Sequence, residues 1–398
     1  MSEDNRAFVA RYSRLLRKAL SSKHVFAFLT RQTIARTPLT RRLFHLHLRA
    51  ASAEEAPHRR IDPGQPIVAG FPIDAAMEAH LRAFSADIGD RLTGGRLTLR
   101  SELKVYEVAD CEVLAWTGAS VHRPTDRVID GPADLEPRAN IRVRPVPGLV
   151  LSMLGSPRGH SHYFHFFEQL TVLLRLLSWI GADEPLTLLV RQELTPFQTA
   201  AYAVLPKRFP HLRVMSVGNC EAIRPERLLI AKATYEHAMD RFALADEWRA
   251  IGGLYQQAYG LAPTTADRKL HLTRRHQRQR RISNEEALEP IFAAHGFETI
   301  APETLSHRDQ VQVMMGTCAV AAVSGAALTN LAFATTPLDL TVMCPREIDE
   351  PFWEPLALLL GCRFAYVEGE TAMWNDHFAV DPARLEAALS AHGVSLAS

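Results

Sequence analysis

The hydrophobic pattern of the chain changes character near Val150. Between about Arg96 and Val150, β-type segments such as LTLRSELKVYEV and CEVLAW are separated by turn-rich stretches such as WTGAS, RPTD and DGPAD. Alternating apolar residues bounded by such breakers predict short strands and turns. This part of the chain therefore reads as a β-rich segment.

After Val150, helical periodicity alternates with short apolar strands. The stretch HYFHFFEQLTVLLRLLSWI predicts a helix, followed by the strand LTLLV, a helix from Thr195, and the strands LRVMSV and RLLIA. HAMDRFALADEWRAIGGLYQQAYG predicts one long helix. This alternation is typical of βαβ units around a mostly parallel sheet.

A second alternating block follows LAPTTADR, whose Pro, Thr and Asp residues suggest a linker. KLHLT predicts a strand, and Ser283 with Glu286 has the spacing of a capping box that opens a helix. Ser306 with Asp309 predicts a second helix start, and AVAAV predicts a strand covered on both faces. DLTVMCP and RFAYVE predict later strands. The fold class expected is α/β with two Rossmann-like domains, at 61–262 and 263–398, after a helical arm at 1–60.

The charge is unevenly distributed. Up to Arg60 there are thirteen Lys and Arg against four Asp and Glu, a net charge of +9 that leaves −8 for the remaining residues. Apolar positions from Phe8 to Leu20 recur at helical spacing opposite a basic face. We interpret the arm as a helix packed on its own domain. Peripheral contact with an anionic membrane surface is the alternative.

The composition indicates the cellular compartment and the state of the cysteines. The five cysteines never occur as CxxC, no apolar leader precedes the basic arm, and no apolar run approaches membrane-spanning length. We therefore expect reduced thiols, a cytoplasmic protein and no cysteine-based zinc site.

Ser324 and Gly325 end the small apolar run VAAV and precede a helix-like stretch. A strand that leads through glycine into a helix presents free N–H groups at its carboxyl end, where phosphates bind. A simple tight turn explains the glycine equally well at this level.

Five arginines cluster between the predicted strand KLHLT and the following helix, in LTRRHQRQRRISNEE. Their repulsion favours an anionic partner, and a diphosphate would satisfy them by bidentate hydrogen bonds. A solvated basic loop and a nucleic-acid patch are the alternatives; without interleaved aromatic residues and with an acidic remainder, RNA binding is disfavoured.

The start of the helix at 162–180 carries a possible acid–base group. His162, His165 and Glu168 lie three residues apart and share one helix face. An imidazole beside a carboxylate can act as a general base near neutral pH. The spacing is not that of a metal site, because HExxH and a third ligand are missing; capping or solvent exposure of these polar residues is the simpler alternative.

Four stretches in order resemble glycosyltransferase family 61, whose bacterial members are often labelled capsular polysaccharide biosynthesis proteins. They are HYFHFFEQLTVLLRL, LTRRHQRQRRISNEE, GFETIAPETLSHRDQV and VSGAALTNLAF. The resemblance implies an inverting transferase of the two-domain GT-B architecture that moves a sugar from a nucleotide donor to a hydroxyl, without a cofactor or bound metal. The domain at 61–262 is then expected on the acceptor side, and the domain at 263–398 is expected to bind the nucleotide-sugar.

The resemblance also assigns roles to residues. It implies His165 as a catalytic residue, and we add Glu168 or His162 as its helper. The donor-binding residues are Arg274, Arg275, Arg280, Arg281, Asn284, Gln310, Ser324, Gly325, Ala326, Thr329 and Asn330. Family members usually have His where Ser324 stands, Asn at His162 and Trp at Phe166.

The expected partners are a nucleotide-sugar donor and a glycan-type acceptor, with no nucleic acid, in surface polysaccharide synthesis. A catalytically silent subunit that binds nucleotide-sugar or glycan is the alternative, favoured by Ser324. The donor, the acceptor and the oligomeric state are not defined by the sequence.

Overall fold

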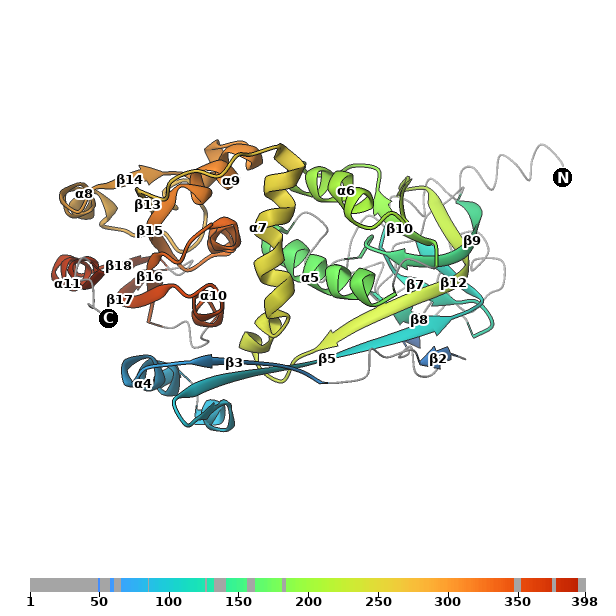
Figure 1. Cartoon of the computed structure of the whole chain (residues 1–398), viewed down its shortest axis with the longest axis horizontal. Helices are drawn as coiled ribbons and strands as arrows, with labels where there is room; N and C mark the ends of the chain where they lie inside the picture. Colours follow the sequence, from blue (N-terminus) through green and yellow to red (C-terminus); the bar gives the residue numbers. More distant parts are fainter. Residues whose placement is uncertain are drawn as a thin grey trace, which may run out of the picture.

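The protein is a mixed α/β molecule built on two sheets, as the computed structural model in Figure 1 shows. The structure describes residues 49–50, 58–60, 66–84, 86–125, 127–131, 141–155, 162–180, 184–346, 352–373 and 377–392. The predicted α/β class is confirmed. The basic helix expected before Leu20 lies outside the described residues; of the arm, the described pieces Arg49–Ala50 and His58–Arg60 are short strands.

The first sheet is mixed. Its strands run in the order β1-β8-β7-β6-β12-β9-β10-β11, and β5 pairs with β12, β2, β3 and β4. The strands are β1 (Arg49–Ala50), β2 (His58–Arg60), β3 (Ile67–Pro72), β4 (Leu92–Thr93), β5 (Arg96–Val108), β6 (Cys111–Leu114), β7 (Ser120–His122), β8 (Arg127–Asp130), β9 (Arg142–Ser152), β10 (Leu186–Arg191), β11 (Leu212–Val217) and β12 (Glu221–Thr234). Strands β12, β9, β10 and β11 are parallel, whereas β5 and β6 pair antiparallel with β12. The predicted change from a β-rich segment to βαβ units near Val150 is thus confirmed.

Helices α5 (Tyr163–Ile180) and α6 (Pro196–Arg208) connect the parallel strands, as predicted. The prediction of one long helix over 237–260 is wrong. It is divided into the 3-10 helix η4 (Ala238–Phe242) and α7 (Ala245–Tyr259). The Asp240 carboxylate explains the break, because it accepts the backbone N–H groups of His237 and Arg100 and so fixes η4 against β5.

The second sheet has the order β14-β13-β15-β16-β17-β18. Its strands are β13 (Arg268–Leu272), β14 (Phe297–Ile300), β15 (Thr317–Val323), β16 (Asp339–Pro345), β17 (Arg363–Met373) and β18 (His377–Ala379). All pairings are parallel except that of β18. The chain reverses direction across the sheet between β13 and β15, and this doubly wound order places ligands at that switch point.

Helices cover both faces of the second sheet. They are α8 (Glu285–Ala294), α9 (His307–Met315), α10 (Glu354–Leu359), α11 (Pro382–His392) and the 3-10 helices η5 (Pro302–Thr304) and η6 (Ala326–Phe333). In β15, Val320 and Ala322 enter one hydrophobic core, while Ala321 and Val323 enter the core beneath α8 and α11. The predicted strand buried on both faces is confirmed.

The two predicted helix starts differ in outcome. Ser306 caps α9, since its Oγ accepts the N–H of Asp309 at 3.2 Å. The capping box from Ser283 is wrong, because the Ser283 hydroxyl donates to Phe378 O instead and α8 begins one residue after Asn284. Pairing with the neighbouring strand takes precedence over the local cap here.

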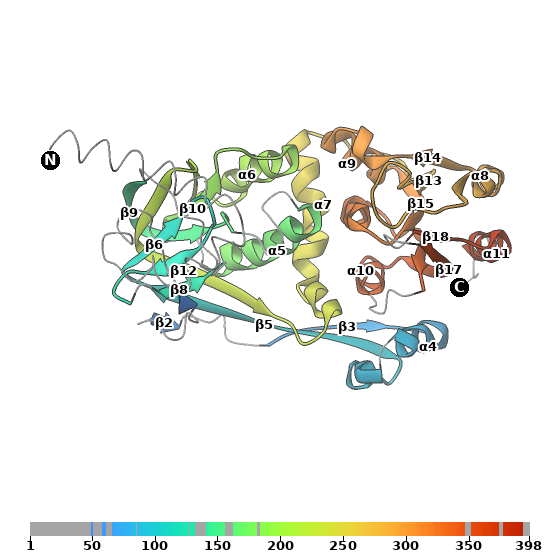
Figure 2. The ribbon, with the colours of Figure 1, turned by 180° about the vertical axis from the view of Figure 1, so that it is seen from behind.

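The two halves of the molecule share one hydrophobic core. Helix α7 stands between the two sheets in both views (Figures 1 and 2), and residues of both halves belong to a single buried cluster. The hairpin of β3 and β5 carries α4 (Ala75–Phe84) to the second half, where His80 Nε2 lies 2.9 Å from Glu354 Oε1. This crossing arm is not evident in the sequence. The predicted boundary at residues 262 and 263 falls in the extended segment between α7 and β13.

Among the described residues, none of the helices combines the length and apolarity needed to cross a membrane.

Candidate functional site

The sequence-predicted donor residues gather at the carboxyl edge of the second sheet. The loop 273–284 follows β13, and Ser324 and Gly325 follow β15. Because β13 and β15 are adjacent and parallel, their following loops meet at the switch point of the sheet.

Arg274 lies directly against Gly325. A Cβ atom added at Gly325 would stand 2.3 Å from Arg274 Nη1. Gly325 has an extended backbone with φ of 173°, so it is required here for space and not for an unusual conformation. The small residue lets the guanidinium reach the turn after β15.

The Arg274 guanidinium is only partly satisfied. Its Nη2 donates to Gln279 O at 3.3 Å, while its buried Nε has no hydrogen-bond partner. Burial, followed by the charge of nearby Arg280, lowers the pKa of Arg274 to about 10. Within the described ranges, neither arginine has a carboxylate at ion-pair distance. The charge of Glu303 opposes this lowering of the Arg274 pKa only weakly, so the two neighbouring cations favour binding of an anion.

Arg275 and Arg281 point to a different place. Arg275 Nη2 donates to Glu289 Oε1 at 2.6 Å, and Arg281 lies against His377 with Nη2 to Nε2 at 3.3 Å. Both line a shallow hollow of about 580 Å³ at the start of α8. The Asn284 side chain is used structurally, because it pairs with both backbone groups of Val380.

The turn after β15 leads into η6, which is a 3-10 helix. An α-helix at this place would give a longer run of aligned peptide groups. Its first hydrogen bond runs from Leu328 N–H to Gly325 O, so the helix itself leaves the N–H groups of Ala326 and Ala327 unused. Ser324 is buried, and its Oγ accepts the indole N–H of Trp353 at 3.2 Å.

Asn330 and Gln310 belong to a hydrogen-bond chain between the two halves. Tyr163 Oη donates to Asn330 Oδ1 at 2.5 Å, and Asn330 Nδ2 donates to Gln310 Oε1 at 3.1 Å. Gln310 Nε2 in turn reaches Pro302 O and Leu305 O. These side chains therefore hold η6 against α5 and α9, and Thr329 is fully buried beside them.

His307 continues this chain toward α7. Its Nε2 lies 3.0 Å from Tyr163 Oη and its Nδ1 lies 2.7 Å from Tyr259 Oη. Burial lowers the pKa of His307 to about 4, so the imidazole is neutral near pH 7. Because Tyr163 donates to Asn330, a neutral ring protonated at Nε2 satisfies every member of the chain.

His165 and Glu168 form a buried pair in the first half. His165 Nδ1 lies 2.8 Å from Glu168 Oε2, and Arg241 Nη1 donates to Glu168 Oε1 at 2.5 Å. Burial would raise the pKa of Glu168, but the hydrogen bond from His165 and the charge of Arg241 outweigh it and lower that pKa. The ring of His162 lies 4.5 Å from that of His165. The pair can hold and orient a proton.

Aromatic packing connects this pair to the turn after β15. Phe164, next to His165 in α5, contacts Trp353 with ring centroids 5.7 Å apart. Trp353 is also the donor to Ser324. The two sets of predicted residues thus meet across the junction of the halves through one tryptophan.

Sequence reasoning missed Arg241, Trp353, Tyr163 and His307. Arg241 and Trp353 lie far along the chain from the groups they contact, and no local spacing marks them. His307 had a usable signal, since it immediately follows the predicted cap Ser306 and a histidine on an apolar helix requires partners.

A doubly wound sheet whose switch point carries a partly satisfied arginine, Arg274, beside a glycine is suited to bind an anionic ligand. Residues 163–343 match the model of the family described as Glycosyltransferase 61. This segment of the chain is therefore a glycosyltransferase family 61 domain, as its four sequence stretches indicated, and the match supports glycosyltransferase activity. No curated protein matches the chain.

Proposed function

We propose that the protein is an inverting glycosyltransferase that uses a nucleoside diphosphate sugar as donor and a hydroxyl compound as acceptor, in surface polysaccharide synthesis. The observation that carries the proposal is the partly buried Arg274 against Gly325, with its Nε lacking an acceptor and with Arg280 as a neighbouring positive charge. A diphosphate supplies the acceptors and the negative charge that this pair lacks.

The reaction forms one bond and breaks another at the anomeric carbon. The acceptor oxygen attacks this carbon from the face opposite the nucleotide, and the bond to the diphosphate oxygen breaks with its electron pair. The acceptor proton passes to the His165–Glu168 pair, in which His165 Nδ1 lies 2.8 Å from Glu168 Oε2. Arg241 keeps Glu168 ionised, so the carboxylate stabilises the imidazolium that forms.

Charge on the departing diphosphate is stabilised by protein groups in place of a divalent cation. Arg274 and the N–H groups of Ala326 and Ala327 lie at the glycine turn, and Arg280 adds a second positive charge near Arg274. Preorganised donors of this kind contribute roughly 3 kcal/mol each to lowering a barrier. Metal independence is part of the proposal, and undiminished turnover in EDTA is the expected result.

The decisive experiment compares nucleotide binding by matched arginine variants. Uridine, guanosine, adenosine and cytidine diphosphates are screened by thermal shift, since a ligand of the folded state raises the midpoint. Arg274→Ala with Arg280→Ala should abolish the shift. Arg275→Ala is the control, because its guanidinium is held by Glu289 outside the glycine turn. An unchanged shift in the double variant would contradict the assignment.

The contacts of Ser324 favour the alternative function, a catalytically silent binding subunit. Its hydroxyl is engaged by Trp353, and no imidazole stands at this position. Hydrolysis of nucleotide-sugars separates the two functions: release of sugar in the absence of acceptor supports the enzyme, whereas binding without release supports the silent subunit.

A further inference from the structure

A cavity of about 580 Å³ lies in the first half, between α5 and strands β9 and β12. It borders the carboxyl ends of these two parallel strands, at Ser152 and Ala233. Its size falls within the range of small-molecule pockets, roughly 300–1,000 Å³. None of its lining residues belongs to the donor site at the second sheet.

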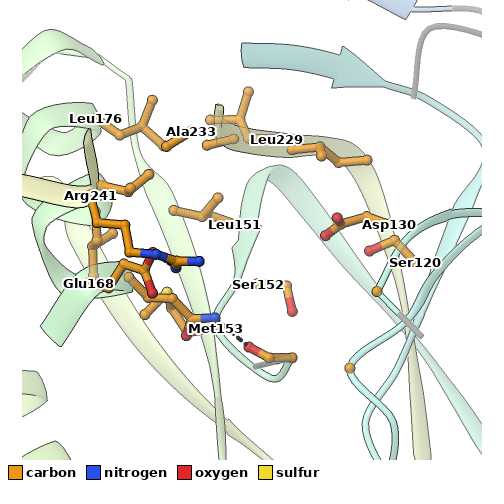
Figure 3. Close-up of a pocket in the computed structure, with 18 of the residues that line it drawn as sticks. Ser120, Asp130, Leu151, Ser152, Met153, Glu168, Leu176, Leu229, Ala233 and Arg241 are labelled. Atoms are coloured by element: carbon orange, nitrogen blue, oxygen red, sulfur yellow. Dashed lines mark hydrogen bonds and ion pairs between the residues drawn. The ribbon is translucent and has the colours of Figure 1, made fainter. Parts of the chain in front are cut away.

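The polar groups of the cavity occupy its sides. In Figure 3, Glu168 and Arg241 stand on one side, Ser120 and Asp130 face them from the other, and Ser152 lies between. Glu168 therefore lines the cavity while it also holds His165 at 2.8 Å. A hydroxyl group bound on this side of the cavity would contact the acid–base pair.

The remaining wall is aliphatic. Val172, Leu173 and Leu176 line it from α5, one to two turns beyond Glu168, and Leu229 and Ala233 line it from β12. In Figure 3, Leu229 and Ala233 lie near Leu176, above the labelled polar residues. Among the described lining residues Tyr235 is the single aromatic one, and it lies at the Arg241 end, over the guanidinium at 5.3 Å. Without flat aromatic faces elsewhere, this wall fits a flexible saturated chain.

We propose that this cavity is the acceptor pocket and that the acceptor carries a saturated hydrocarbon portion next to its reactive hydroxyl. The inference rests on the proposed transferase function and names the class of its second substrate. The hydroxyl lies at Glu168 and gives its proton to the His165–Glu168 pair, while the hydrocarbon runs along Val172 and Leu176. The new bond joins the acceptor oxygen to the sugar, and the nucleoside diphosphate leaves.

The packing of α5 connects this pocket to the donor side. Phe164, adjacent to His165, contacts Trp353, which donates to Ser324 beside Gly325. This packing is the structural connection between the side of α5 that carries Glu168 and the turn after β15.

The first test measures binding alone. Calorimetric titrations compare n-octyl and methyl β-D-glucopyranoside, below the micelle concentration of the octyl compound, on the wild-type protein. The octyl compound should bind at least about tenfold more tightly, because buried methylenes each raise affinity. Equal affinity of the two probes would overturn the proposal.

Matched variants test whether the preference for the octyl compound arises in this cavity. Ala233→Phe and, as a second variant, Ala231→Leu fill the aliphatic part and should remove the octyl preference. Ala203→Phe adds the same ring on the exposed face of α6, outside the cavity, and should retain it. If both filling variants fold, by their thermal midpoints, and still prefer the octyl probe, the hydrocarbon binds elsewhere and the proposal is wrong.

Donor hydrolysis separates this inference from the proposed function. A protein that releases sugar from a nucleotide donor but shows no octyl preference retains the transferase proposal and loses the acceptor class. A protein that binds the octyl probe through this pocket but neither binds nor hydrolyses any nucleotide-sugar loses the transferase proposal instead, and the pocket remains as an amphiphile site.

Discussion

The carboxyl ends of the parallel strands in the two sheets both present arginine, in opposite electrostatic settings. In the first half, Arg241 is paired with Glu168, which also holds His165, so the charges are balanced within the protein. In the second half, Arg274 has Arg280 as its charged neighbour and no carboxylate at ion-pair distance among the described residues. The first arrangement suits the handling of a proton, and the second suits the reception of an anion.

The largest expected effect comes from Gly325→Ala. The added Cβ would stand 2.3 Å from Arg274 Nη1, so the flexible guanidinium moves away from the turn. We expect turnover to fall about 10³-fold, the upper range for losing a preorganised donor, with little change in thermal midpoint. Gly253→Ala in α7 is the control, because a Cβ there meets no atom within 4 Å. Wild-type kcat in Gly325→Ala would remove the Arg274 contact from the mechanism.

Glu168→Gln tests the site in the first half, where the charges are balanced within the protein. It leaves His165 and Arg241 without their carboxylate, and we expect kcat to fall about 10²-fold, a typical value for impaired acid–base catalysis. Glu289→Gln is the matched control, since it breaks the exposed ion pair with Arg275. Steady-state kinetics across pH should show a changed profile for Glu168→Gln only. Identical profiles in the two variants would rule out Glu168 as part of the proton relay.

The pKa of Glu168 also sets a stability effect. A carboxyl whose pKa is lowered by folding stabilises the protein above its ordinary value of 4.5, and this contribution disappears as pH falls through the lower folded value. The wild-type protein should therefore lose more unfolding free energy than Glu168→Gln when the pH is lowered below 4.5.

The helices of the two regions were predictable from the sequence, whereas the contacts between their residues were not. Periodicity located α5, and the Ser306 cap located α9, because both signals lie within one segment. The sequence named Arg274 and Gly325 only as donor-binding residues implied by the family resemblance, and it did not predict their contact. Its detail depends on a glycine whose extended backbone any residue could adopt, so only the neighbouring side chain explains it.

Contacts across the halves were not predictable from local pattern. The β3–β5 arm brings His80 to Glu354, residues 274 positions apart, and Arg241 meets Glu168 from 73 positions away. The helix expected over 237–260 failed for the same reason, since Asp240 is committed to the backbone of β5. Helical periodicity carries no information on such a partner.

His307 provides a smaller effect, in stability, at the junction between the two regions. Its pKa is lowered from 6.5 to about 4, so between these values the unfolded chain binds a proton that the folded protein does not. Stability should therefore fall as pH decreases from 6.5 toward 4, by about 1 kcal/mol per pH unit from this residue.

His307→Gln should reduce that slope, whereas His276→Gln on the exposed arginine loop should retain it. Urea unfolding at several pH values measures both. The buried His271, whose pKa is lowered to about 3 by burial, contributes its own slope in every variant. Equal slopes in wild type and His307→Gln would show that the Tyr163–His307–Tyr259 contact does not hold the imidazole neutral.

Trp353→Phe should have the smallest effect, although Trp353 is the residue that joins the two regions. A phenyl ring retains the contacts with Phe164 and Phe352 but loses the hydrogen bond to Ser324. One such bond contributes about 1 kcal/mol, so unfolding free energy should fall by that amount and turnover by only a few-fold. A loss as large as that of Gly325→Ala would mean that the indole, and not the arginine pair, positions the turn after β15. The contact through Trp353 would then matter more for activity than the difference in charge between the two regions.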